Sequence, residues 1–499
     1  MGTSLSVSKA RDAAVATPLV GVVDIGSNSV RLVIFEDGVR SPDYFFNEKT
    51  ICQLGADLGA TGRLSEEGKV RALTALTRYA ALAENMGVAE TIAIGTAALR
   101  EAEDGPEFRE EITARTGLKV RVVSGREEAT LAAEGVLLGW PSFEGVVADL
   151  GGSSLELAKV KGGKVDHAIS SPSGHLRLTD IASPEARRAM MALSAAAGPF
   201  AQDGGRLILV GGAWRALAKA HMAPEKYPFL VLQGYELSHD AARDLCEWAI
   251  AASPSDLKKM AEVSSSRLTS VAAGAHALLR LLEDIRPAEV AISAFGVREG
   301  VAHERMSKAT RTQEPLISAA RRAEARNARC PGFGDELFDW MAPLIADFDE
   351  ETRRLTHATC LMHDVNWRAH PDYRAAACFG AVTRANLGGV GHKGRLFMGA
   401  ALVHRYKGSS QDKEATDAVA RLPDDLRAKA EIVGRAARLG AMLSGSIIGT
   451  LDHCGLTVEE GALILTYDNG AGVFAGERVE RRLNALADRL GLAGEIRLS

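Results

Sequence analysis

The sequence is poor in the residues that would place it in several large classes of protein. Its 499 residues include only 6 cysteines, none of them in a C-x-x-C pair, so neither a zinc site nor a disulfide framework is indicated. No stretch has about 18 consecutive apolar residues, and the Ala/Ser-rich residues 1–18 contain no apolar core of signal-peptide length. We therefore expect a disordered tail over residues 1–18 and a soluble, cytoplasmic protein with no membrane partner.

The chain also has no large excess of positive or negative charge and few disorder-promoting residues. The formal net charge is only -5, which argues against a specific nucleic-acid partner. With 16 prolines, 46% hydrophobic residues and 25% charged residues, the composition is that of an ordered globular protein. The chain is too long for one hydrophobic core, so several domains are expected.

The most informative feature present is a repeated segment. Asp24–Leu32 and Asp149–Leu157 both read Asp-[Ile/Leu]-Gly-x-x-Ser-[Val/Leu]-x-Leu. Each follows an apolar run typical of a buried strand and turns through glycine and serine into a second strand. One copy alone could be an ordinary hairpin. Two copies in one register favour two related α/β lobes that face each other across a cleft, each with a phosphate-binding loop.

The residue types in both loops suit a phosphate and a cation. Glycine lets the main chain approach an anion, N–H and hydroxyl groups donate to phosphate oxygens, and carboxylates hold a divalent cation or a water molecule. The phosphate-binding candidates are Gly26, Ser27, Asn28, Ser29, Arg31, Gly151, Gly152, Ser153 and Ser154; the metal candidates are Asp24, Asp149 and Glu156. Arg31 and Glu156 occupy equivalent positions with opposite charge. We therefore expect the first loop to be specialised for the anion and the second for metal and water, with Glu156 also a catalytic candidate.

The pattern along the chain predicts an α/β fold in several parts. Alternating strands and helices predict one lobe over residues 19–124 and a second over 125–305. The composition then becomes charged and Ala/Arg-rich, which predicts a helical domain over 306–425. Strand-like runs around a helix predict a small α/β module over 426–499.

Five motifs in this order resemble the exopolyphosphatase/guanosine pentaphosphate phosphatase (Ppx/GppA) family: Val23–Ser29, Gly95–Arg100, Ser124–Ala129, Asp149–Glu156 and Gly296–Gly300. The resemblance implies two actin-like ATPase (ribonuclease H-like) lobes with the active site in the cleft between them. It also implies hydrolytic release of a terminal phosphate with a divalent metal, usually Mg²⁺, and favours a homodimer.

Two residues acquire roles through this resemblance. Glu128 matches the family's catalytic base, which could take a proton from water in line with the terminal phosphate; its neighbour Glu127 is the alternative. Arg100 matches a phosphate-contacting arginine. Its alternative role is a salt bridge to Glu101 or Glu103.

The sequence departs from the family pattern at two turns. The second loop commonly reads Gly-Gly-Gly-Ser-Thr-Glu, whereas here Ser153 replaces the third glycine, which narrows the approach to phosphate and adds a hydroxyl. After Gly211 and Gly212, the bulky Trp214 could restrict a nucleotide base or could anchor the core.

Longer family members carry a domain similar to HD phosphohydrolases, and Leu361–Val365 resembles its signature. His363 and Asp364 could therefore be metal ligands, or they could be packing and capping residues. A long polyanion should also require a basic channel. The candidates on the C-terminal domain are Lys393, Arg395, His404, Arg405 and Lys407; the alternative is that these side chains form a solvated helix face.

The leading functional hypothesis is a metal-dependent phosphoanhydride hydrolase, an exopolyphosphatase that releases orthophosphate from the end of inorganic polyphosphate. Guanosine pentaphosphate, a nucleotide of the stringent response, is the second candidate substrate. An acceptor-dependent kinase of the same fold and a non-catalytic sensor of guanosine tetraphosphate or polyphosphate are the rival hypotheses. The family resemblance supplies the substrate names.

Overall fold

The computed structural model describes residues 17–201, 204–224, 227, 229–253, 255–257, 268–407, 413–468 and 471–498. Nearly all of the predicted N-terminal tail lies outside the described residues. The chain divides into two compact units, the first comprising residues 1–226 and 232–313 and the second comprising 227–231 and 314–499. Among the described helices, none has the length and apolar character needed to cross a membrane.

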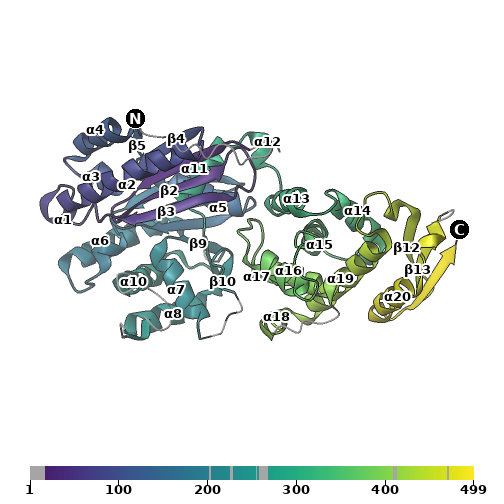
Figure 1. The fold of residues 1–499 in the computed structure, drawn as a ribbon. Helices are drawn as coiled ribbons and strands as arrows, with labels where there is room; N and C mark the ends of the chain where they lie inside the picture. Colours follow the sequence, from purple (N-terminus) through teal and green to yellow (C-terminus); the bar gives the residue numbers. More distant parts are fainter. Residues whose placement is uncertain are drawn as a thin grey trace, which may run out of the picture. The chain divides into compact units, whose positions relative to one another are not determined.

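The first lobe of the first unit is built on a five-stranded sheet in the order β3-β2-β1-β4-β5 (Figure 1). Its strands are β1 (Leu19–Ile25), β2 (Ser29–Glu36), β3 (Tyr44–Ile51), β4 (Glu90–Gly95) and β5 (Val120–Val122). Its helices are α1 (Leu58–Thr61), α2 (Glu66–Asn85), α3 (Ala97–Glu101) and α4 (Gly105–Thr116). The central strand β1 is apolar along nearly its whole length because both faces of the sheet are covered.

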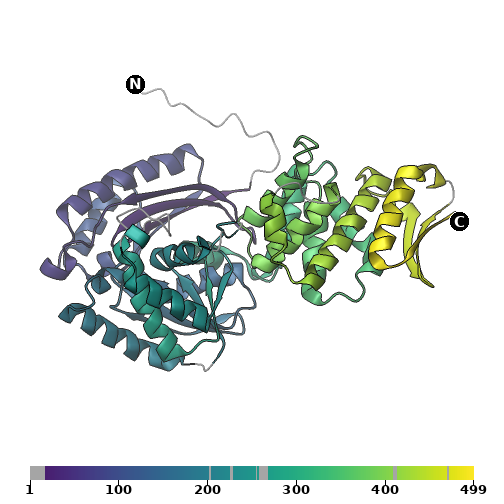
Figure 2. The ribbon, with the colours of Figure 1, turned by 90° about the horizontal axis from the view of Figure 1, so that it is seen from below.

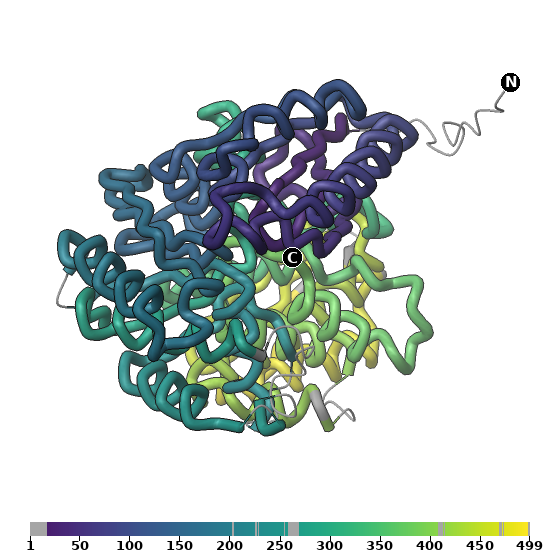
Figure 3. The backbone as a smooth tube through the Cα atoms, turned by 90° about the vertical axis from the view of Figure 1, so that its left-hand side faces the viewer, coloured from purple at the N-terminus to yellow at the C-terminus, as the bar shows by residue number. Residues whose placement is uncertain are grey.

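The second lobe has a six-stranded sheet in the order β10-β11-β9-β6-β7-β8. Its strands are β6 (Gly145–Leu150), β7 (Leu155–Lys161), β8 (Lys164–Ser171), β9 (Arg206–Val210), β10 (Tyr235–Ser238) and β11 (Glu289–Ile292). Its helices are η1 (His175–Leu178), α6 (Pro184–Ala197), η2 (Gly198–Phe200), α7 (Gly212–Met222), α8 (His239–Ala251) and α10 (Leu268–Ile285). Figure 3 shows the two lobes in purple and teal.

The two repeated segments fold as equivalent hairpins. Asp24 lies opposite Arg31 in the antiparallel β1–β2 pair, and Asp149 lies opposite Glu156 in the β6–β7 pair. Side chains directly opposite each other in such a pair lie on the same face of the sheet. The first hairpin therefore places a cation beside its aspartate, and the second places another carboxylate there.

Two helices connect the lobes: α5 (Gly125–Gly139) follows the last strand of the first sheet, and α11 (Val297–Arg305) follows the last strand of the second. Helix α5 packs on β6, β7 and β8, and α11 packs on β1 and on α5. A Cβ atom on Gly300 would lie 1.9 Å from the Leu131 carbonyl oxygen, and one on Gly135 would lie 2.1 Å from the Gly296 oxygen. The main chains of α5 and α11 are therefore in direct contact.

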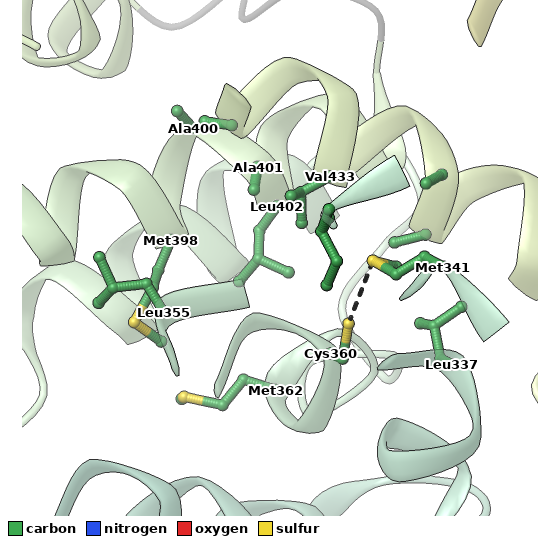
Figure 4. Packing of buried hydrophobic residues seen from close by; sticks show 14 of the residues in the cluster. Leu337, Met341, Leu355, Cys360, Met362, Met398, Ala400, Ala401, Leu402 and Val433 are labelled. Carbon is green, nitrogen blue, oxygen red and sulfur yellow. Dashed lines mark hydrogen bonds between the residues drawn. The ribbon is translucent and has the colours of Figure 1, made fainter. Parts of the chain in front are cut away.

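The first unit ends with α12 (Lys308–Arg311), and the second is mainly helical (Figure 2). Its elements are α13 (Pro315–Asn327), α14 (Phe333–Trp340), η4 (Ala342–Leu344), α15 (Glu350–Met362), α16 (Arg374–Arg384), α17 (His392–Tyr406), α18 (Lys413–Val419), α19 (Asp424–Ser444), η5 (Leu451–His453), β12 (Cys454–Glu459), β13 (Ala462–Tyr467), η6 (Ala471–Phe474), α20 (Glu477–Leu490) and β14 (Ala493–Leu498). One hydrophobic core contains Phe229 and residues between Leu316 and Ala487, and Figure 4 shows part of it.

The structure places the divisions of this region differently from the sequence. The unit begins at residue 314, not 306, and the predicted division between residues 425 and 426 falls inside α19. Helix α19 packs against both α17 and α20, so the helical part and the three-stranded sheet share one core.

A short segment from elsewhere in the sequence completes the second unit. The Tyr227 hydroxyl lies 2.7 Å from Nδ1 of His392, and the Phe229 side chain is only 3% exposed within the core of this unit. The guanidinium of Arg421 stacks over the Tyr227 ring. Residues 227–231 thus belong to the second unit although the chain before and after them belongs to the first.

Candidate functional site

A cavity of about 510 Å³ lies between the two phosphate loops in the first unit. This volume is typical of sites for small-molecule ligands. All the predicted phosphate-binding residues line it, as do Asp24, Glu128, Asp149 and Glu156. The structure therefore brings together every predicted site residue except Arg100.

The two loops have the same main-chain turn. The Gly26 N–H donates to the Ser29 carbonyl oxygen at 3.1 Å, and the Gly151 N–H donates to the Ser154 oxygen at 3.0 Å. A Cβ atom on Gly26 or Gly151 would lie 3.3 or 3.2 Å from these acceptor oxygens. The repeated sequence thus specifies the same tight turn in both lobes.

Helix η1 holds the second loop in place. The main-chain carbonyl oxygens of residues 151–153 accept hydrogen bonds of 2.9 to 3.1 Å from the N–H groups of residues 174–176. Carbonyl oxygens repel an anion, and these three are already bonded to main-chain donors. The loop therefore keeps its hydroxyl and N–H groups as the chemistry available to a phosphate.

The two loops touch each other across the cleft. Ser153 Oγ donates to Ser27 Oγ at 2.8 Å, and both side chains are buried. Arg177 continues this contact, since its Nε donates to the Ser153 carbonyl oxygen and its Nη2 lies 3.3 Å from Glu101 of α3. The serine that replaces the family's third glycine therefore bonds to the opposite lobe.

The adjacent glutamates Glu127 and Glu128 have different environments. Glu127 forms a capping box with Ser124: its carboxylate accepts the Ser124 N–H at 2.8 Å, and the Ser124 hydroxyl accepts the Glu127 N–H. These hydrogen bonds lower the pKa of Glu127. Glu128 instead lines the cavity and is only 8% exposed. The structure thus places Glu128, and not Glu127, at the site.

Burial raises the pKa of Glu128 to about 7, despite the opposing effect of Arg100. The nearby carboxylates of Asp149 and Asp24 raise it further. A carboxyl with this pKa is partly deprotonated at neutral pH and is a stronger base than an exposed glutamate.

Arg100 holds Glu128 and does not line the cavity. Its Nη1 donates to the Val123 carbonyl oxygen at 2.9 Å and to Glu128 Oε2 at 3.1 Å, and its Nη2 lies 4.0 Å from Glu101. Nη1 of this guanidinium therefore bonds to the buried carboxylate of Glu128 and to a main-chain carbonyl, and the predicted contact with phosphate stays a prediction.

The carboxylates of Asp149 and Glu156 fit a divalent cation. Burial raises the pKa of Asp149 to about 6 and that of Glu156 well above its usual range, although Ser170 donates to Glu156 at 2.8 Å. Two repelling carboxylates opposite each other are a suitable donor set for Mg²⁺, which often takes one or two carboxylates together with substrate phosphates.

The predicted third metal ligand, Asp24, is engaged elsewhere. Its carboxylate forms an ion pair with Arg298 Nη1 at 3.0 Å. Within the residues that the structure describes, no group of three or more histidine, cysteine, aspartate or glutamate side chains is arranged to hold a metal. Asp149 and Glu156 are therefore better placed for a metal than Asp24, and the set of three ligands stays a prediction.

Six further polar residues line the cavity and were not predicted as site residues: Lys49, Thr96, His175, Arg215, Lys219 and Arg298. The signals for two of them are in the sequence, since Arg298 lies in the Gly-Val-Arg-Glu motif and Arg215 follows two glycines. Lys49 lies on the unpredicted strand β3, and no motif marks His175. The lining thus carries five Lys or Arg side chains and four carboxylates, so it suits an anion bound together with a cation.

Trp214 is a core residue. It is fully buried, and its indole N–H donates to the Gly274 carbonyl oxygen at 2.8 Å. It is absent from the cavity lining, so it does not restrict the space for a nucleotide base.

The HD-like residues of the second unit are bonded to protein groups. Arg329 donates to both oxygens of Asp364 at 2.7 and 2.8 Å. His363 Nδ1 lies 2.7 Å from the Cys360 carbonyl oxygen, and burial lowers the pKa of this histidine to about 4. These contacts fit the packing interpretation of the two residues.

One member of the predicted basic channel is also a packing residue. Arg395 is fully buried and donates to the carbonyl oxygens of Thr383, Ala385 and Leu387. Its guanidinium cannot face a polyanion, so it is removed from that prediction.

The lobes and their facing loops define a two-lobed α/β protein with a polar cavity lined by two Gly/Ser loops. Residues 33–309 match the Ppx/GppA phosphatase family, and residues 316–496 match the exopolyphosphatase C-terminal family. The chain belongs to the Ppx/GppA phosphatase family, which confirms the resemblance and the predicted fold.

Among curated relatives, Exopolyphosphatase 1 of Mycobacterium tuberculosis is 29% identical over 164 residues, which are 32% of this chain and 47% of that protein. The chain thus spans about half the length of the curated relatives it matches. The solved structure of the Aquifex aeolicus Ppx/GppA family member has 27% identity and a TM-score of 0.51, covering 57% of this chain and 97% of that one. The structure of an exopolyphosphatase from Cytophaga hutchinsonii has 22% identity and a TM-score of 0.52, covering 58% of this chain and 99% of that one, and shows the shared fold.

Proposed function

We propose that the chain is a phosphatase that releases orthophosphate from the end of inorganic polyphosphate by attack of water in the cavity of the first unit. The observation that carries this proposal is the buried carboxylate of Glu128, with a pKa raised to about 7, at the edge of a cavity built from two phosphate loops. The names of the relatives support the choice of substrate.

In this proposal, Glu128 removes a proton from the attacking water as the new bond to phosphorus forms. The two loops bind the terminal phosphate through N–H and hydroxyl groups, and Arg298 and Arg31 offset its charge. Arg100 positions Glu128 through their hydrogen bond. Asp149 and Glu156 would hold Mg²⁺, which supplies charge neutralisation to the phosphates when it is bound.

Guanosine pentaphosphate is the second candidate substrate. The position of Trp214 is compatible with this nucleotide, because the Trp214 side chain lies in the core and leaves the cavity open to a larger ligand.

Measuring phosphate release from polyphosphate and from guanosine pentaphosphate, each with Mg²⁺, tests the proposal. We expect Glu128→Gln to reduce kcat by about 10²- to 10⁴-fold, since it removes the base and keeps the shape of the side chain. The matched control is Glu127→Gln, which should keep most of the activity because Glu127 only caps α5.

Release of phosphate from neither substrate by the wild-type protein would refute the proposal. So would equal rates in the wild type and Glu128→Gln. ATP consumption that requires an added acceptor would indicate a kinase, and tight binding of either compound without turnover would indicate a sensor.

A further inference from the structure

The two serines that meet across the cleft use their hydroxyl groups differently. The Ser153 hydroxyl donates to Ser27 Oγ at 2.8 Å, and both side chains are buried and line the cavity. A serine hydroxyl has one proton to donate, whereas its oxygen can accept two hydrogen bonds. Ser153 therefore has its only hydroxyl proton engaged with the opposite lobe.

Ser27 keeps its own hydroxyl proton. Within the described part of the chain, its hydroxyl accepts from Ser153 and donates to no protein acceptor. The lone pair that faces Ser153 is occupied, so the O–H bond of Ser27 must point in another direction. Because Ser27 lines the cavity, a ligand there can accept this proton.

Main-chain segments of both lobes enclose the Ser27 side chain. The Gly55 N–H donates to the Ser27 carbonyl oxygen at 2.8 Å, and a Cβ atom on Gly55 would lie 3.0 Å from Cβ of Ser27. In the second loop, a Cβ atom on Gly152 would lie 3.4 Å from the same Ser27 atom. The position of the Ser27 hydroxyl is thus fixed by the two lobes together.

The next serine of the second loop is also bonded to protein. Burial raises the pKa of Glu156, and a hydrogen bond from the Ser154 hydroxyl opposes this effect. The hydroxyl groups of Ser153 and Ser154 therefore both have protein acceptors. The first loop is left to supply the hydroxyl donor that a bound phosphate can use.

The serine pair lies at the enclosed end of the cavity. Among the lining residues, Lys49 and Gly212 are exposed, so the cavity opens on their side. Ser27 and Ser153 are only 5% and 6% exposed. A chain of phosphates that enters from the opening would therefore place its terminal phosphate at this pair.

We propose that Ser27 donates its hydroxyl proton to the terminal phosphate, and that Ser153 is the positioning residue that fixes the direction of this hydroxyl. The inference rests on the proposed function and names which of the two serines touches the substrate. Hydrogen bonds to a charged phosphate oxygen are strong, and a donor that is already oriented does not have to reorganise when the ligand binds.

Phosphate release from polyphosphate with Mg²⁺ tests both roles. Ser27→Ala removes a donor to a charged group and should lower kcat/KM by about 10- to 100-fold. Ser153→Ala keeps this donor but frees its direction, so kcat/KM should fall by about 2- to 10-fold, the range for one neutral hydrogen bond. Adding Ser153→Ala to Ser27→Ala should cause no further loss, because the hydroxyl that Ser153 orients is gone.

Thermal unfolding separates positioning from a purely structural role. Both single variants lose the same hydrogen bond between Ser27 and Ser153, so their Tm should fall equally although their activities differ. Equal losses of both activity and Tm would mean that the bond only ties the lobes together, and would overturn the proposal. A loss from Ser153→Ala that persists in the Ser27→Ala background would also overturn it, since Ser153 would then contact the phosphate itself.

The matched control is another pair of serine hydroxyls in the second lobe. Ser171 Oγ and Ser173 Oγ are 2.7 Å apart and buried, Ser173 donates to the Ala189 carbonyl oxygen, and neither serine lines the cavity. Ser171→Ala thus removes a buried hydroxyl–hydroxyl bond away from the site. This variant should keep the wild-type kcat/KM.

Binding of orthophosphate separates this inference from the proposed function, because it needs no turnover. Calorimetric titration of orthophosphate with Mg²⁺ should give the highest affinity for the wild type, a lower one for Ser153→Ala and the lowest for Ser27→Ala. If the wild type releases no phosphate but the affinities follow this order, the proposed function fails and the roles of the two serines stand. Equal affinities in all three proteins would refute those roles.

Discussion

Glu127 and Glu128 show how far one position along a helix can separate two identical side chains. At the first turn of α5, the Glu127 carboxylate accepts a hydrogen bond from the main chain of Ser124. The Glu128 carboxylate lines the cavity and is largely removed from solvent. The first has a lowered pKa and the second a raised pKa. The chemistry of the site therefore follows from the rotation of α5 as much as from the residue type.

The raised pKa of Glu128 predicts the pH dependence of activity. A base must be deprotonated, so kcat/KM for phosphate release should rise as the pH increases through about 7 and then level off. A pH–rate profile between acid and mildly alkaline pH measures this. Constant activity across that range would contradict the assignment of Glu128 as the base.

The same shift has the opposite effect on stability. Between the ordinary glutamate pKa of 4.5 and the folded-state value of about 7, the unfolded chain has released the proton of Glu128 and the folded chain still binds it. The contribution of this residue to the free energy of unfolding therefore falls as the pH rises through that window.

The motifs of the sequence predicted the loop residues and carboxylates that line the cavity, and missed contacts that depend on tertiary packing. The glycines and serines of the two loops carry their turn in their own sequence. Arg100 was assigned to phosphate, but its guanidinium is bound by Glu128, which is 28 positions away. His175 reaches the cavity because η1 packs behind the second loop, and no pattern in the sequence reports that contact.

At the scale of elements, the contact between α5 and α11 leaves no space for an added side chain at Gly300. Leu131 of α5 and Val301 and Ala302 of α11 cover one face of the first sheet, while α5 also covers the second sheet. The absence of a side chain at Gly300 lets the two helices approach this closely.

Gly300→Ala should therefore destabilise the first unit by at least about 2 kcal/mol, because the new methyl group would collide with a main-chain oxygen. Gly59→Ala in α1 of the same unit is the control, since a Cβ atom there meets nothing within 4 Å. Denaturant unfolding of both variants measures the difference. Equal midpoints would show that α5 and α11 can move apart without cost.

The sequence predicted the buried strands of both lobes and missed β3, β8 and β10. The missed strands lie at the edges of their sheets and mix charged, polar and apolar residues, as in Lys164–Ser171. An edge strand has a neighbour on one side only, so its sequence carries a weaker pattern than that of a central strand.

At the scale of the whole molecule, the boundaries of the two units could not be read from composition. The sequence placed a division near residue 306, where the charge pattern changes, but α12 still belongs to the first unit. The sequence could not assign residues 227–231 to the second unit. A sequence pattern describes neighbours along the chain, whereas this segment packs against residues that are distant in the sequence.

Phe229→Ala should lower the stability of the second unit by about 3–5 kcal/mol, because it leaves a cavity in the core that this unit shares. Leu230→Ala, at the adjacent position, should have little effect, since that side chain is 51% exposed. Thermal unfolding of the full chain compares them. An equal loss in both variants, or in neither, would show that the segment does not contribute to this core.

The position of residues 227–231 also sets an order of events on the ribosome. These residues leave the ribosome exit tunnel before any of the residues from 314 onward have been translated. Until the later helices emerge, the chain lacks residues of the second unit that contact Tyr227 and Phe229, among them His392, and exposed aromatic side chains on a nascent chain can be recognised by chaperones. If translation stops before the second unit is complete, this aromatic pair stays exposed and distinguishes the incomplete chain from the full-length one.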